Sequence, residues 1–134
     1  MPSDTFPSRV RLKNAPGSSL SFTVAALYGL HSSSHLLILN DKEEAACIYN
    51  DLEALLGFDI TFFFPTTYRN NNTPFSADTG SLQIRAMAIA SLADADKRPV
   101  IVTYPEALCE KVISKKNLIE NRVWLGIGDN ISIE

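Results

Sequence analysis

The sequence lacks the features that define several classes of protein. It has no uninterrupted apolar run near the roughly 20 residues of a membrane-spanning helix. The first five residues also lack the basic flank and apolar core of a signal peptide. Lys and Arg (12) do not outnumber Asp and Glu (15), and the net charge of −3 argues against a general attraction to nucleic acid, which needs clustered positive charge. These absences predict a cytoplasmic protein with no membrane partner.

Cysteine is scarce and histidine is sparse, which limits disulfide and metal chemistry. Cys47 and Cys109 are far apart and form no C-x-x-C pair, so we predict two reduced thiols that are buried or partly buried. His31 and His35 are separated by three serines in a polar break and have no third ligand nearby. We therefore predict solvated loop histidines, no bound metal and no cofactor for this domain.

The remaining composition is that of an ordinary globular domain. The chain has 134 residues, of which 46% are hydrophobic and 20% charged, enough for one domain with a real core. Residues 1–9 read as a flexible lead-in, and residues 10–134 as a single α/β domain. The last segment reads as the beginning of a strand with nothing to pair with. We therefore expect a fragment of a longer multidomain protein.

Apolar runs alternate with helical periodicity along the chain. The run 36–39 is continuous, as in a strand buried on both faces, and the helix over 22–30 is mostly apolar and predicted to be well buried. A polar connection over 66–78 separates the second strand from the third helix. The full set of predicted strands is 10–12, 36–39, 60–64, 99–103, 123–127 and 131–133, and that of helices is 22–30, 42–56, 79–93 and a short one from 105, with a polar–apolar link over 117–121.

This alternation predicts the fold class. Strands that alternate with helices give an α/β structure with helices on both sides of a mainly parallel sheet. We therefore expect a three-layer α/β domain.

The stretch 13–22 has the layout of a phosphate-binding loop: a short strand, a turn of small residues and a helix. When G-x-x-x-x-G-K-[ST] is laid on it, the first glycine falls on Asn14, the second on Ser19 and the lysine on Leu20, while Ser21 keeps its type. The shape is expected to survive without the charge that holds a triphosphate. The candidate residues of this degenerate loop are Asn14, Gly17, Ser18, Ser19, Leu20 and Ser21.

Several segments, in order and spacing, resemble one protein family. They are residues 14–19 before a helix, 36–41 followed by 43–45, 63–65, 83–85, 100–108, and 125–134 with the pattern L-x-x-G-x-x-[IL]-x-[IL]-E. Together they resemble the N-terminal region of the bacterial transcription-repair coupling factor. That region is similar to the first domain of the B component of excinuclease ABC.

The resemblance implies a fold and a function. The fold would be a P-loop NTPase or helicase-like half domain with a degenerate phosphate loop. The domain would be a non-catalytic scaffold, whereas the parent would be an ATP-dependent DNA translocase that binds RNA polymerase and DNA and couples stalled transcription to nucleotide excision repair. Its partners would be other domains of the parent and the A component of excinuclease ABC, the latter mainly through a domain inserted after this segment.

Two other functions stay open at this stage. An enzyme or binding protein could hold an anionic metabolite at the helix start after Gly17, where backbone N–H groups face outward. A nucleic-acid binder could use the basic cluster of Lys111, Lys115 and Lys116. Within the long connection, Tyr68, Arg69 and Phe75 are the candidate partner contacts, and no catalytic set stands out by spacing.

Overall fold

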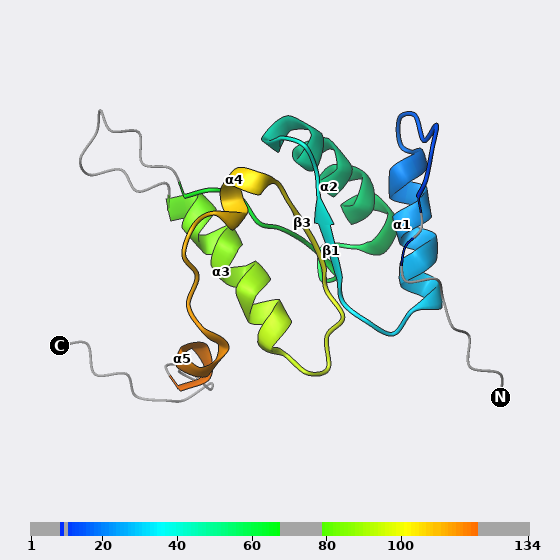
Figure 1. Ribbon diagram of the computed structural model, residues 1–134. Coiled ribbons are helices and arrows are strands. Elements are labelled where there is room, and N and C mark those ends of the chain that lie inside the picture. The colour runs from blue at the N-terminus through cyan, green and yellow to red at the C-terminus, as the bar shows by residue number, and fades with distance from the viewer. Residues whose placement is uncertain (1–8, 10, 68–78, 121–134) are drawn as a thin grey trace, which may run out of the picture.

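Helices and strands alternate along the chain, as the sequence predicts (Figure 1). The computed structural model describes residues 9, 11–67 and 79–120. The strands in this part are β1 (His35–Ile38), β2 (Thr61–Phe63) and β3 (Val100–Thr103). The helices are α1 (Ser19–Leu30), α2 (Lys42–Leu56), α3 (Thr79–Ala93), α4 (Pro105–Leu108) and α5 (Lys115–Glu120). The chain is therefore an α/β protein.

The described strands form a small, wholly parallel sheet. Its order is β1-β3-β2, so that β3 lies in the centre and pairs with both neighbours. In the register, Leu36 and Phe62 both lie opposite Ile101. All four residues of β3 are buried, as expected for a central strand covered on both faces. The predicted parallel sheet is confirmed.

Side chains of the second strand and of the residue after it alternate between two covering helices. The Thr61 hydroxyl donates a hydrogen bond to the Leu52 carbonyl of α2, and the Phe63 ring lies 5.5 Å from the Tyr49 ring of the same helix. Phe64 points the other way, with the Arg85 guanidinium of α3 3.9 Å from its ring centroid. Since successive strand residues face opposite sides, α2 and α3 cover opposite faces of the sheet. The three layers are visible in Figure 1.

Helix α2 shows how local sequence sets the ends of an element. The Asp41 carboxylate accepts the Glu44 backbone N–H at 2.8 Å, and the Glu44 carboxylate accepts the Asn40 N–H at 3.0 Å. The first bond satisfies a donor that the first turn leaves without a helical partner, and the second fixes the residue before the N-cap to the same turn. The helix ends at Gly57, whose φ of +102° disfavours any residue with a Cβ. Ala45, Ile48 and Leu52 form its buried stripe.

Two elements are less buried than their apolar sequences predict. In α1 the buried residues are Ser21 and Val24, and Phe22 and Leu30 are 62% and 72% exposed. The helix packs beside α2 as an outer element, so one side of it faces solvent. Strand β1 was predicted to be buried on both faces, but its burial alternates, because it lies at an edge of the sheet and α3 packs over β2.

Other local predictions were also wrong. Residues 11–12 are exposed coil and not part of a strand, and Val10 lies outside the described residues. The segment predicted as a link contains α5. Cys47 and Cys109 are both exposed free thiols, because they lie on the solvent-facing side of α2 and at the end of α4. The predicted strands 123–127 and 131–133 lie outside the described residues. Within the described chain, no helix has the length and apolarity needed to span a membrane.

Candidate functional site

The loop of residues 11–18 lies toward the end of the molecule to which the strands point. Helix α1, which ends at Leu30, and strand β1, which begins at His35, run in opposite directions (Figure 1). The N-terminus of α1 and the loop before it therefore lie toward the carboxyl ends of the strands (Figure 1). Ligands of open α/β sheets bind at this end. Residues 11 and 12, which lead into the loop, are coil and not a strand of the sheet.

The loop backbone is closed by a tight turn just before α1. The Ser19 hydroxyl and the Ser19 N–H both donate to the Pro16 carbonyl, at 2.7 and 3.3 Å. Asn14 and Gly17 have left-handed φ values of +56° and +57°, a region that glycine and asparagine enter at low cost. Ser18 occupies the N-cap position of α1 but makes no side-chain capping bond. Residues 11–18 are all exposed.

Leu20 and Ser21, at the positions that would act on a triphosphate, instead pack into the protein. Leu20, in the lysine position, packs against the hydrophobic core. The Ser21 hydroxyl donates to Asp51 Oδ2 of α2 at 3.1 Å, and Ser21 is 0% exposed. A magnesium-binding serine needs its oxygen directed at the nucleotide. Here the oxygen is part of the contact between α1 and α2.

The remaining candidate residues are dispersed. Tyr68, Arg69 and Phe75 lie outside the described residues. The rings of His31 and His35 are 6.5 Å apart, and within the described chain no three His, Cys, Asp or Glu residues are grouped to hold a metal ion. The exposed Lys116 ammonium lies 3.8 Å from Glu120 in the next turn of α5. Among the described candidates, the loop residues lie together before and at the start of α1, and the two histidines and Lys116 lie in other elements.

Sequence reasoning missed a buried cluster around Arg85 at the carboxyl end of β2 and β3. Arg85 is 5% exposed, and its guanidinium donates to the carbonyls of Pro65 at 2.8 Å and Ala107 at 3.1 Å. It also lies 3.5 Å from the Glu110 carboxylate. Arg85 is the single charged residue of the 15-residue helix α3, and that isolation is the signal that could have identified it. The side chain links α3 to the segments that leave β2 and β3.

Glu110 and two threonines complete this cluster. The Glu110 carboxylate accepts the Thr67 N–H at 2.8 Å and the Thr67 hydroxyl at 2.7 Å, while the Thr66 N–H donates to the Tyr104 hydroxyl at 3.0 Å. Burial alone would raise the pKa of Glu110, but the two bonds from Thr67 and the charge of Arg85 outweigh it and lower that pKa. Because each polar group of the cluster binds another, the cluster stabilises the packing of α3 against the segments that follow β2 and β3.

Comparisons with protein-family models, with curated proteins and with solved structures give no match to this chain. The functional interpretation therefore depends on the residues and their geometry.

Proposed function

We propose that this chain is a non-catalytic scaffold domain from the N-terminal region of a bacterial transcription-repair coupling factor. The ordered motifs quoted from the sequence support this proposal, as does the parallel α/β sheet with a loop and helix start toward its carboxyl end. In this proposal the domain has a P-loop NTPase or helicase-like ancestry and acts in the cytoplasm. The parent is an ATP-dependent DNA translocase that binds RNA polymerase and DNA and recruits the A component of excinuclease ABC.

The observation that carries the non-catalytic part of the proposal is the position of Leu20 and Ser21. A lysine in this position makes a charge-assisted contact with the terminal phosphates and supports phosphoryl transfer. Leu20 provides neither a charge nor a donor, and it packs against the core. The Ser21 hydroxyl is held by Asp51, whose carboxylate would also repel phosphate. In this proposal the loop is a degenerate phosphate loop that lacks the groups needed to hold nucleotide and metal.

Titration with ATP and magnesium tests this part directly. We expect no saturable binding up to millimolar nucleotide, that is, a binding free energy weaker than about −4 kcal/mol. The Ser21→Ala variant should give the same null result, because its hydroxyl faces Asp51. Micromolar binding that shifts the amide resonances of Gly17 to Ser21 would contradict the proposal. Saturable binding of inorganic phosphate alone at those amides would favour the anionic-metabolite alternative.

The family assignment has a separate test in the coding sequence. We expect the codons that follow Glu134 to encode an inserted partner-binding domain and, much further on, the motifs of a helicase motor. This result would support the scaffold role independently of the nucleotide titration. A stop codon soon after Glu134, or a following domain of unrelated type, would overturn the assignment.

A further inference from the structure

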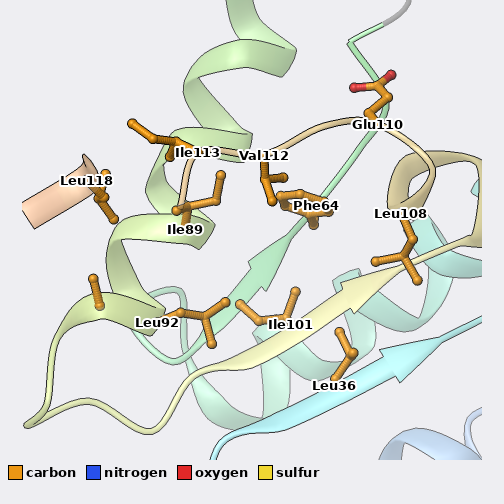
Figure 2. A pocket seen from close by; sticks show the side chains of 11 residues that line it. Leu36, Phe64, Ile89, Leu92, Ile101, Leu108, Glu110, Val112, Ile113 and Leu118 are labelled. Atoms are coloured by element: carbon orange, nitrogen blue, oxygen red, sulfur yellow. The ribbon is translucent and has the colours of Figure 1, made fainter. Parts of the chain in front are cut away.

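An apolar groove lies on the α3 side of the sheet (Figure 2). It has a volume of about 350 Å³. Strand side chains form its floor, α3 forms one wall, and the segment between α4 and α5 forms another (Figure 2). Its main lining residues are Leu36, Phe64, Ile89, Leu92, Ile101 and Leu118. Glu110 lies at its edge, and its carboxylate is already bound by Thr67.

The groove exposes large aliphatic side chains to water. Leu36 on β1 is 59% exposed and Leu92 on α3 is 52% exposed, and Val112 and Ile113 beside them are also exposed. Each Å² of apolar surface removed from water is worth roughly 25 cal/mol, and large contiguous apolar patches mark interaction sites. An occupant that covers this groove therefore gains stability from burial alone.

The sequence places a matching apolar segment next to the groove. Helix α5 contributes Leu118 to the lining and ends at Glu120. After Asn121 and Arg122 the sequence reads Val-Trp-Leu-Gly-Ile over 123–127, which is uncharged and contains the single tryptophan of the chain. Four residues of extended chain reach about 14 Å at most, which is enough to return from the end of α5 to a groove that α5 itself borders.

We propose that the segment 123–127 of this same chain docks in the groove, with the Trp124 indole as its anchor. An indole buries roughly 150–250 Å² of surface and dominates the energetics of such contacts. The tether favours this occupant over an external one, because a segment attached at the rim has a high effective concentration. These residues lie outside the described part of the structure, so the proposal depends on the groove and on the sequence. It is independent of the proposed function.

Fluorescence of the single tryptophan tests the docking in the full chain. We expect native emission to be blue-shifted relative to the urea-unfolded chain, and quenching by acrylamide to be reduced severalfold. Leu92→Asp places a charge on the α3 wall of the groove and Leu36→Asp places one on its floor, and each should restore quenching toward the unfolded value. Leu30→Asp is the matched control, since Leu30 is 72% exposed on the opposite layer, and it should leave the protection unchanged.

Each alternative outcome contradicts the proposal in a recognisable way. A freely quenched tryptophan in the native chain shows that the segment does not dock. Protection that survives both groove variants, in proteins whose far-UV circular dichroism is native, shows that the indole is buried elsewhere. Protection that appears only as protein concentration rises shows that the segment binds a second copy of the chain.

Discussion

Replacement of Arg85 by methionine should lower the free energy of unfolding by about 3–5 kcal/mol, the range expected when a buried charged partner is removed. Methionine fills similar space but has no donor. The carbonyls of Pro65 and Ala107 would then lose the guanidinium that binds them at 2.8 and 3.1 Å. Unsatisfied buried acceptors cost about 1–3 kcal/mol each. The Glu110 carboxylate would also lose the guanidinium that lies 3.5 Å from it.

Urea unfolding followed by circular dichroism measures the free energy of unfolding. Two further variants test whether the loss is specific to the contacts of Arg85. Arg98→Met is the control, because Arg98 is exposed and also donates to a carbonyl, that of His31, at 3.2 Å. Its loss should lower the free energy of unfolding by less than about 1 kcal/mol. Arg85→Lys keeps the charge but not the planar fork, so its effect should fall between the two. If Arg85→Met and Arg98→Met lower the free energy of unfolding by equally small amounts, the cluster does not stabilise the fold.

Replacement of Glu110 by glutamine should cost about 1–3 kcal/mol at neutral pH, because hydrogen bonds to a charged group are worth more than neutral ones. The carboxylate accepts both the N–H and the hydroxyl of Thr67. Glutamine keeps the shape and one acceptor oxygen but loses the charge that faces Arg85. The expected effect is therefore smaller than that of removing Arg85.

The dependence of this effect on pH follows from the pKa of Glu110. Contacts with Thr67 and Arg85 lower that pKa below the ordinary value of 4.5 despite partial burial. A lowered folded-state pKa means that the ionised form stabilises the fold. The stability difference between wild type and Glu110→Gln should therefore be complete above pH 4.5 and should shrink as pH falls through the folded-state pKa.

Urea unfolding of the wild type and the variant at neutral and at acidic pH measures this difference. Glu106→Gln, an exposed glutamate on α4, is the matched control and should show little change at either pH. A difference for Glu110→Gln that stays constant from neutral to acidic pH would show that the charge of Glu110 does not act through these contacts.

The order of elements could be read from the sequence because local signals coincide there. Asp41, the apolar stripe of α2 and Gly57 each indicate the same helix, and the run 100–103 indicates a buried strand. The order of these signals along the chain was enough to predict a parallel sheet. The P-loop interpretation of the fold remains a proposal.

The burial of β1 and α1 and the partners of Arg85 could not be predicted from the sequence, because they depend on where each element lies in the fold. The run 36–39 looks as apolar as 100–103, yet β1 lies at an edge and β3 in the centre, and composition does not encode that difference. The apolar α1 was predicted to be buried but packs as an outer helix. Arg85 was hidden inside an apolar pattern because its partners are carbonyls 20 and 22 residues away in sequence.

The strand order also bears on how the chain folds during synthesis. Neither β1 nor β2 hydrogen-bonds to the other, and both pair with β3, the last strand of the described chain. In a nascent chain that stops before residue 100, neither β1 nor β2 has a partner strand among the described residues, even if the helices have already formed. The sheet must close late and through distant pairings, which slow folding and leave unpaired edges open to misassembly until then.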